Sequence, residues 1–347
     1  MSIVALFSCL AWAAGEKKPP ARYIPQPPST LSLCGDKVPL EKPYVAEQLD
    51  REFHIAVNDT AQVVLWMKRA SRYFPYFSAR LKEAGLPDDL KYLAVAESAL
   101  LHQSKSWAGA VGAWQFIPAT GRRYGLRENR WFDDRRNVAL ATNAAIAYLK
   151  TLYDLFKSWP LAMAAYNCGE ARVKQAIKEQ GVKNYYELAL PNETQRYVYR
   201  IMAAKIILRD PEAFGYCLPK SRLYQPQATD QVRLTLRRHT HLKVIADAAG
   251  ITVRRVIDLN PELKAMHLPP GTHNLNLPKG AGKGFQQKLA KAKPPQPPLE
   301  LVWVVKPGDS LGAIAKKTGC RIQELRRANG LSGNLIKPGQ KLTIPKK

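Results

Sequence analysis

The chain has 347 residues, of which 46% are hydrophobic, so it can bury a core and is not a generally disordered protein. Its length predicts roughly two or three domains. The formal net charge of +25 indicates an anionic partner, although charge alone does not identify that partner.

The N-terminus predicts an export signal. Residues 1–14 are apolar and end in small side chains, with an expected cleavage site near Ala13 or Ala14. This stretch is too short for an ordinary membrane span, and no other stretch is long and apolar enough to be one. Lipid attachment at Cys9 is an alternative, but Phe7 makes the preceding residues a poor lipidation motif. We therefore expect an exported protein of the periplasm or cell envelope.

A mainly helical region is predicted over residues 45–218, after a Pro-rich, extended lead-in at residues 15–44. Apolar side chains recur there at three- and four-residue spacing, and strand-like alternation is scarce. The predicted helices include residues 61–71, 73–84, 138–156, a segment beginning at 159–166, and 194–208.

One further predicted helix, within residues 87–101, carries a carboxylate on its apolar face. Its apolar stripe consists of Leu90, Leu93, Ala94, Leu100 and Leu101. Glu97 lies seven residues after Leu90, so it falls on the same stripe. Burial without a cationic partner raises the pKa of a carboxylate, which suits a general acid working near neutral pH. The alternative is a structural carboxylate paired with Arg122 or Arg123.

The stretch after this helix is rich in Gly and Ala and predicts a loop that lines a cleft. Its larger side chains are Trp107, Trp114, Gln115 and Phe116. Farther on, Asp133 and Asp134 stand beside two arginines and predict a charged turn. Glu193 lies at a probable helix start, where a capping role is expected.

Four segments resemble, in this order, the lytic transglycosylases that cleave bacterial peptidoglycan: Glu97-Ser98, GAVGAWQFIPATGRRYGL, AAYNCGEARV and ETQRYV. The resemblance covers residues 45–218. It implies a lysozyme-like fold for the helical domain, peptidoglycan strands as the substrate, and no cofactor.

The resemblance also implies a mechanism with a single carboxylate. Glu97 matches the family's catalytic position, where it protonates the leaving glycosidic oxygen and then acts as base toward the 6-hydroxyl of the same MurNAc, giving a 1,6-anhydro product. The matching substrate-binding positions are Ser106, Gln115, Tyr166, Asn167 and Tyr197. On pattern alone, each of these could instead be a core or loop residue.

Two other classes of function stay open at this point. A muramidase-type hydrolase usually needs a second carboxylate, for which Asp133 and Asp134 are the best candidates. A non-catalytic wall-binding protein would need neither. The sequence shows no recognised nucleic-acid motif, so we expect no nucleic-acid partner despite the basic charge.

Four cysteines follow the predicted export signal and allow three pairings. Cys34 and Cys217 flank the helical domain, and domain termini often lie close together, so these two are candidates for a bridge. No His/Cys cluster has metal-ligand spacing, and we predict no metal site. His239 and His241 are expected to be surface residues.

The C-terminal part contains a repeat. Residues 304–345 resemble a LysM module, a sugar-binding unit of strand-helix-helix-strand order, through a GDSL turn and a KPGQKLTIP ending. Residues 239–278 follow the same order but lack the Gly-Asp opening, which makes their sugar binding doubtful. The predicted units are a degenerate LysM-like unit at 232–279, a Lys/Pro-rich linker at 280–300 and a LysM domain at 301–346. The fold class is therefore α+β and multidomain.

In the second unit, the resemblance implies binding of GlcNAc-containing chains through backbone in two loops. The positions concerned are Gly308, Asp309, Ser310, Leu311, Asn329, Leu331 and Ile336. Tethering a weak sugar binder to a catalytic domain raises the local concentration of substrate.

Overall fold

The computed structural model describes residues 23–292 and 301–345, and the chain divides into two compact units after Gln227. The predicted export signal and Cys9 lie outside the described residues. Within the described part, no helix has both the length and the apolar character that a membrane crossing requires.

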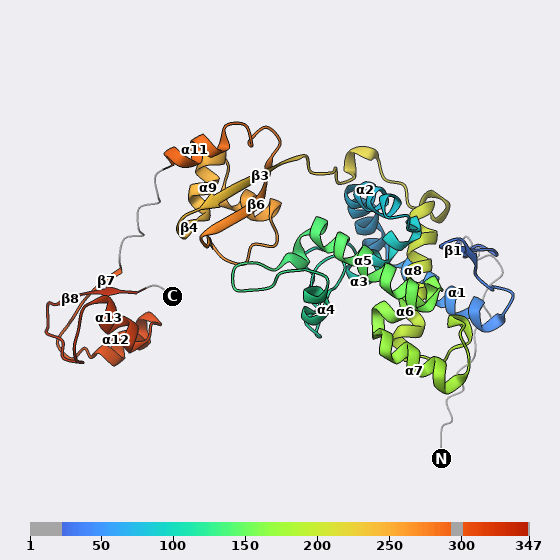
Figure 1. The fold of residues 1–347 in the computed structure, drawn as a ribbon, viewed down its shortest axis with the longest axis horizontal. Coiled ribbons are helices and arrows are strands. Elements are labelled where there is room, and N and C mark those ends of the chain that lie inside the picture. Colours follow the sequence, from blue (N-terminus) through green and yellow to red (C-terminus); the bar gives the residue numbers. More distant parts are fainter. Residues whose placement is uncertain (1–22, 293–300, 346–347) are drawn as a thin grey trace, which may run out of the picture. The chain divides into compact units, whose positions relative to one another are not determined.

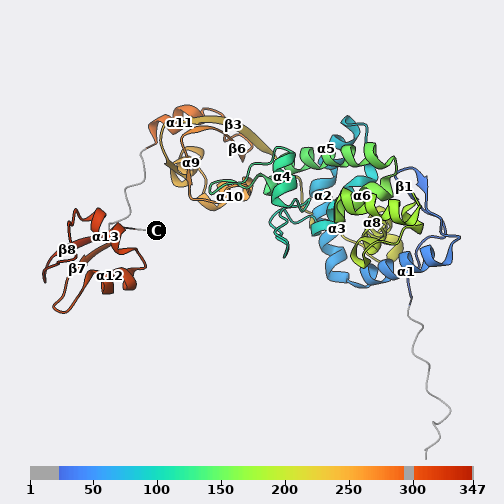
Figure 2. The same ribbon diagram turned by 60° about the horizontal axis from the view of Figure 1, so that its bottom comes forward.

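The first unit is built from helices around one core (Figure 1). They are α1 (Pro43–Asn58), α2 (Thr60–Glu83), α3 (Lys91–Ser98), α4 (Pro118–Arg123), α5 (Val138–Phe156), α6 (Trp159–Cys168), α7 (Glu170–Gln180) and α8 (Asn192–Arg209). Figure 2 shows α8 among α1, α3 and α6, against which it packs. Most of its side chains are buried, as expected for a helix that is covered on several sides.

The predicted helices at 138–156, 159–166 and 194–208 are confirmed, and α5 begins where the Asn137 side chain accepts hydrogen bonds from two backbone N–H groups. The prediction of separate helices at 61–71 and 73–84 is wrong, because α2 runs through both. Pro75 lies inside α2 and removes one backbone donor without ending the helix.

The predicted helix around Glu97 is shorter than expected. A 3-10 turn at Asp88–Leu90 leads into α3, which ends at Ser98 because Ala99 and Leu100 adopt left-handed backbone conformations with φ of 52° and 63°. Leu100 is still buried, but Leu101 is 41% exposed and does not belong to the apolar stripe.

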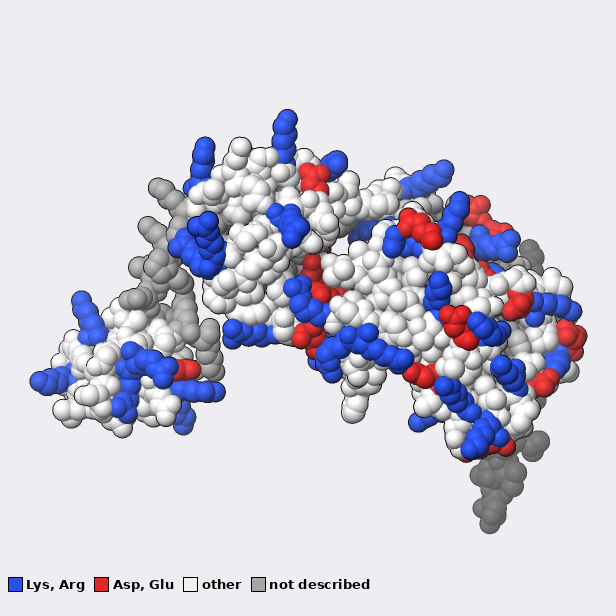
Figure 3. All heavy atoms as spheres, viewed as in Figure 1, with Lys and Arg blue, Asp and Glu red and all other residues white. Residues whose placement is uncertain are grey.

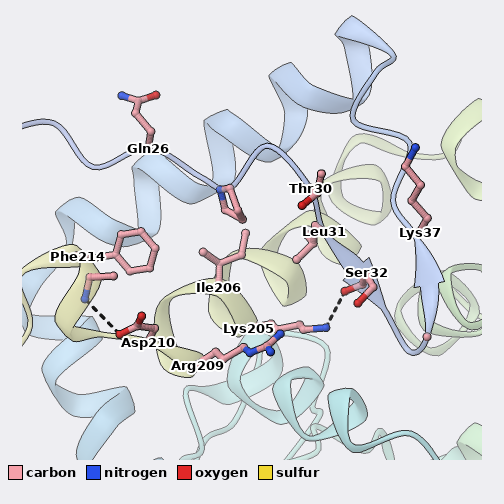
Figure 4. Close-up of a pocket in the computed structure, with 13 residues that line it drawn as sticks. Gln26, Thr30, Leu31, Ser32, Lys37, Lys205, Ile206, Arg209, Asp210 and Phe214 are labelled. Carbon is pink, nitrogen blue, oxygen red and sulfur yellow. Dashed lines mark hydrogen bonds between the residues drawn. The ribbon is translucent and has the colours of Figure 1, made fainter.

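The lead-in is more ordered than the predicted extended segment. It forms a hairpin of β1 (Ser32–Leu33) and β2 (Asp36–Lys37), and the Leu33 side chain is fully buried. The buried Lys205 of α8 holds this hairpin, since its amine donates to the Ser32 carbonyl at 2.6 Å and to Asp89 at 2.7 Å. Figure 4 shows the lead-in crossing the end of α8, with a cavity of about 730 Å³ between them.

All four cysteines of the described part are free. The suggested bridge between Cys34 and Cys217 is therefore wrong. The Cys34 thiol is partly buried beside Asp89, and burial raises its pKa well above the usual range.

The second unit begins with a module that has two helices against an antiparallel pair of long strands. Its elements are β3 (Thr229–Leu236), β4 (Thr240–His241), α9 (Leu242–Ala249), α10 (Val253–Leu259), β5 (His267–Leu268), β6 (Gly271–Pro278) and α11 (Phe285–Lys291). We call residues 228–292 the first LysM-type module. Helix α11 lies inside the predicted linker at 280–300 and packs on α9 with Phe285 buried, so this part of the linker is structured.

Residues 301–345 form the second LysM-type module. Its elements are β7 (Leu301–Val304), α12 (Leu311–Thr318), α13 (Ile322–Ala328) and β8 (Lys341–Ile344), with β7 and β8 antiparallel. The predicted βααβ order is present, and Leu311, Ile314 and Leu325 of the helices fill a small core with Leu342.

Candidate active site

Glu97 is the last residue but one of α3, and the helix end is fixed on both sides. The Ser98 hydroxyl donates to the Ala113 carbonyl at 2.8 Å, which ties α3 to the following loop. Arg69 of α2 donates to the Ala99 carbonyl at 3.0 Å, at the first left-handed residue. The helix therefore presents Glu97 from a rigid end.

The Tyr197 hydroxyl of α8 donates a hydrogen bond to Glu97 Oε1 at 2.5 Å. The pKa of Glu97 is raised to about 7, mainly by burial and to a smaller extent by the nearby Glu193. The hydrogen bond from Tyr197 and the charge of Arg200 act in the opposite direction. Arg122 and Arg123, suggested as structural partners, instead pair with Glu128 and Glu170.

The loop after α3 is held by a buried arginine. Arg135 forms two hydrogen bonds to Asp133, at 2.8 and 2.9 Å, and donates to the carbonyls of Gly109 and Phe116. Gly112 has φ of 90°, and a Cβ there would lie 1.9 Å from the Arg135 carbonyl oxygen, so only glycine fits this approach.

The predicted charged turn at Asp133 and Asp134 is present as a 3-10 turn at Asp134–Arg136, but both aspartate side chains are buried. Asp133 is committed to Arg135, and Asp134 accepts from the Arg127 backbone and guanidinium at 3.1 Å. Neither carboxylate lines a cavity with Glu97.

The predicted cleft-lining loop divides between core and surface. Trp114 is fully buried, donates to the Thr142 hydroxyl at 3.0 Å, and is a core residue rather than a cleft residue. Phe116 is buried but still lines the cavity beside Glu97, and Trp107 is fully exposed at its rim.

Two predicted substrate-binding residues lie on this loop. The Ser106 hydroxyl accepts from the Ala110 N–H at 3.0 Å, which leaves its own proton available. Gln115 has φ of 48°, and its amide nitrogen donates to the Gly112 carbonyl at 2.7 Å, which leaves the amide oxygen as an acceptor.

Tyr166 and Asn167 lie near the end of α6. The Tyr166 hydroxyl donates to the Trp114 carbonyl at 2.7 Å, and the Asn167 amide oxygen accepts from the Thr194 hydroxyl at 2.9 Å. These bonds orient both side chains from the core side.

One cavity of about 750 Å³ brings the predicted residues together; we call it the motif cavity. Its lining includes all six of them: Glu97, Ser106, Gln115, Tyr166, Asn167 and Tyr197. Glu97 also lines a second cavity of about 590 Å³, which we call the α2 cavity because Trp66 and Arg69 of that helix form part of its wall. The carboxyl group thus stands where two hollows meet.

The sequence analysis missed several residues of the motif cavity. Arg200 lines both cavities, and Tyr148 and Glu170 line the motif cavity. Arg200 follows Tyr197 by three residues and therefore shares its helix face, so helical spacing could have found it. Glu193 lies in the first turn of α8, close to the predicted helix start, but no side chain caps this helix; Glu193 instead lines the motif cavity and forms an ion pair with Arg200.

Among the residues that the structure describes, no group of three or more His, Cys, Asp or Glu is placed to hold a metal ion. His239 is exposed, and the partly buried His241 caps α9 by accepting from the Lys243 N–H at 3.0 Å.

The polar residues predicted to bind glycan in the second LysM-type module are used inside it. The Asp309 carboxylate accepts from the Trp303 indole at 2.8 Å and from the Lys306 N–H at 3.0 Å, and these bonds lower its pKa. Ser310 caps α12, and Leu311 is buried.

The other predicted glycan-binding positions also have structural roles within the module. The Asn329 side chain connects α13 to β8 through Leu325 and Thr343. Leu331 and Ile336 pack partly on the core, and Gly308 turns the chain with φ of 89°. The side-chain polar groups at these positions are therefore used within the module, and mainly backbone groups of the two loops are left for a ligand.

Three family models match the chain. They are the Transglycosylase SLT domain at residues 75–189, the Lytic transglycosylase MltD, LysM-like domain at 228–294, and the LysM domain at 304–345. The mixed α+β fold class, with a helical domain followed by LysM units, is confirmed.

Among curated relatives, membrane-bound lytic murein transglycosylase D of Escherichia coli (strain K12) is 34% identical over 296 residues, which is 80% of this chain and 64% of the relative. Peptidoglycan transglycosylase gp16 of Escherichia phage T7 is 33% identical over 139 residues, 39% of this chain and 10% of that protein. An inactive mutant of lytic transglycosylase Slt from Pseudomonas aeruginosa, a solved structure, is 21% identical with a TM-score of 0.31, covering 44% of this chain and 26% of that one.

The chain spans less than two thirds of the length of the first of these relatives, at 64%. Residues 75–189 match the transglycosylase SLT domain, residues 304–345 match the LysM domain, and most of the chain is similar in sequence to membrane-bound lytic murein transglycosylase D.

Proposed function

We propose that the chain is a peptidoglycan lytic transglycosylase. It cleaves the β-1,4 bond between MurNAc and GlcNAc and leaves a 1,6-anhydroMurNAc end. The observation that carries this proposal is Glu97, a carboxyl group with a pKa of about 7 at the meeting point of two cavities. The matches to a transglycosylase SLT domain and to a lytic murein transglycosylase support it.

In the first step, protonated Glu97 gives its proton to the glycosidic oxygen, and the bond from that oxygen to the anomeric carbon of MurNAc breaks. A pKa near 7 keeps a large fraction of Glu97 protonated at neutral pH, as a general acid requires. The two cavities on either side of Glu97 would hold the two halves of the strand.

In the second step, the ionised Glu97 takes the proton of the 6-hydroxyl of the same MurNAc. The 6-oxygen then bonds to the anomeric carbon, which closes the anhydro ring and returns Glu97 to its protonated form. The Tyr197 hydroxyl stabilises the ionised carboxylate between the steps through its hydrogen bond. No water is consumed, so no second carboxylate is needed.

The substrate-binding roles follow from the free polar atoms of the motif cavity. The Gln115 amide oxygen and the Ser106 hydroxyl proton are left for the acetamido and hydroxyl groups of the sugar. Asn167 offers its amide hydrogens, and Tyr166 supplies an aromatic wall close to Glu97.

The ion pairs of the neighbouring carboxylates argue against a muramidase-type hydrolase. Of the other acids in the motif cavity, Glu170 pairs with Arg123 at 2.9 Å and Glu193 pairs with Arg200. Pairing to arginine suits a carboxylate that stabilises structure rather than one that must activate water.

In this proposal, the second LysM-type module binds glycan strands through its two loops and keeps the catalytic domain on its polymer. Basic side chains are scattered over the visible face of each part rather than gathered into one stripe, which suits an anionic polymer mesh better than a nucleic-acid duplex (Figure 3). The predicted export signal would carry the protein to the periplasm or cell envelope.

Mass spectrometry of the fragments released from purified peptidoglycan tests the proposal. We expect fragments that end in 1,6-anhydroMurNAc. Reducing ends, heavier by one water, would mean a hydrolase, and absence of cleavage would mean a wall-binding protein.

A further inference from the structure

The first LysM-type module contains a cavity of about 640 Å³ that the proposed activity does not use. It lies between the end of β3, the following turn, His267 and helix α11. We call it the cationic cavity, because Arg237, Arg238 and three histidines are among its lining residues and no Asp or Glu is.

The two arginines have uncommitted guanidinium groups. Arg237 and Arg238 follow each other at the end of β3, and both are exposed. Within the described part of the chain, no carboxylate pairs with either of them, in contrast to Arg254 on α10, which pairs with Asp258 at 2.9 Å. Ten possible N–H donors therefore face solvent without a protein acceptor.

Two histidines stand on the opposite strands of the short β4–β5 pair. The rings of His241 and His267 are 4.6 Å apart and nearly perpendicular, at 88°. Since His241 Nδ1 accepts from the Lys243 N–H, its ring proton is on Nε2, which makes that nitrogen a donor. Both rings line the cavity with the arginines.

The rear of the cavity is apolar and fixed. Leu236 and Val244 are buried there, and Leu289 of α11 closes one side. Gln286 of the same helix donates to the Arg233 carbonyl, which ties α11 to β3. The turn that carries Arg237 and Arg238 therefore follows directly after a strand that is tied to α11.

The second LysM-type module has a different opening on the same scaffold. In both modules an asparagine, Asn260 or Asn329, joins the second helix to the last strand by three hydrogen bonds. The turn before the first helix holds a carboxylate, Asp309, in the second module, whereas the first module places His239 and His241 in the corresponding turn. The two modules thus share this asparagine connection and differ in charge at the turn before the first helix.

We propose that the cationic cavity of the first LysM-type module binds a phosphate group, as a soluble phosphate ester or a phospholipid headgroup. A carboxylate has two oxygens and is satisfied by one guanidinium, whereas two guanidinium groups and two imidazoles together match the three oxygens and the higher charge of a phosphate. The site is separate from the glycan-binding loops of the second module and from Glu97.

Calorimetric titration of the full chain with inorganic pyrophosphate at low ionic strength tests this site. The double variant Arg237→Gln/Arg238→Gln should bind about tenfold more weakly or worse, because charge-assisted hydrogen bonds are lost. The matched control is Lys288→Gln/Lys291→Gln, which removes the same charge from exposed positions on α11 outside the cavity lining; it should change the affinity by less than about twofold. Circular dichroism checks that both variants remain folded.

Three results would overturn the proposal: no pyrophosphate binding by the wild type, equal weakening in both double variants, or tighter binding of succinate than of pyrophosphate. Sedimentation with phosphatidylglycerol vesicles separates the two sources. If the arginine variant also loses vesicle binding, the ligand is a lipid headgroup; if only pyrophosphate binding falls, it is a soluble phosphate ester.

Discussion

Two asparagines that belong to sequence motifs, Asn167 in the first unit and Asn329 in the second, have different roles. Asn167 accepts one hydrogen bond, from Thr194 at 2.9 Å, and lines the motif cavity with its remaining donors. Asn329 uses both ends of its amide within the second LysM-type module, donating to Leu325 and Thr343 and accepting from Thr343 at 2.6 Å. Asn167 thus keeps donors for the motif cavity, whereas Asn329 uses its whole amide to hold its module together.

This difference predicts different consequences of substitution. In the motif cavity, removing a polar group should change the rate of cleavage and leave the fold intact. In a LysM-type module, it should unfold the module and leave the chemistry intact, since the polar side chains there bond within the module. The following variants test whether the two units differ in this way.

The largest expected effect is that of Glu97→Gln, which keeps the shape of the side chain and removes its proton. Cleavage of peptidoglycan should fall by roughly a hundredfold to ten-thousandfold. Sedimentation with insoluble peptidoglycan should show unchanged binding. The matched control is Glu179→Gln, on the exposed face of α7. Asp133→Asn would be a poor control, because it leaves the buried Arg135 without its partner. If Glu97→Gln retained activity, Glu97 would have no part in the mechanism.

Asn329→Ala should come next. It removes three hydrogen bonds, one to Leu325 of α13 and two to Thr343 of β8, and should destabilise the second LysM-type module by about 3 kcal/mol. Polymer binding should weaken, while turnover of short soluble fragments should stay the same. Asn260→Ala makes the matched change in the first module. If Asn329→Ala lost polymer binding with its module still folded by NMR, the side chain would be a ligand contact rather than a scaffold residue.

Tyr197→Phe should have the smallest effect, lowering the rate about tenfold through loss of one hydrogen bond to a charged group. The Tyr197 hydroxyl stabilises the ionised form of Glu97, so its removal raises the pKa of Glu97 above about 7. Because the acid form is needed for the first step, the alkaline limb of the kcat/KM profile should move to higher pH. A limb that moved to lower pH would contradict the assignment of the hydrogen bond.

The long helices and the Glu97 position could be predicted from the sequence because their signals are local. Residues 138–156 repeat apolar side chains over a long stretch and follow a capping Asn137, and the structure has the same bounds. Glu97 stands on a stripe whose period is visible in the sequence.

The errors arose where contacts across the fold decide the outcome. Trp114 appeared suited to a cleft, but a hydroxyl 28 residues away, on Thr142, accepts its indole proton inside the core. Asp133 was a candidate for a second catalytic carboxylate, and only the fold shows that it is buried and paired with Arg135. Ala99 ends α3 in a left-handed conformation that its residue type does not favour.

The most direct test of the account is the titration of Glu97 itself, by NMR of the ¹³C-labelled side-chain carboxyl group in the wild type, with Glu97→Gln to assign the signal. The account predicts a pKa of about 7, with the group still largely protonated at pH 6. A pKa near the ordinary 4.5 would mean that Glu97 is ionised at neutral pH, and it would contradict the proposed role of this residue as the proton donor.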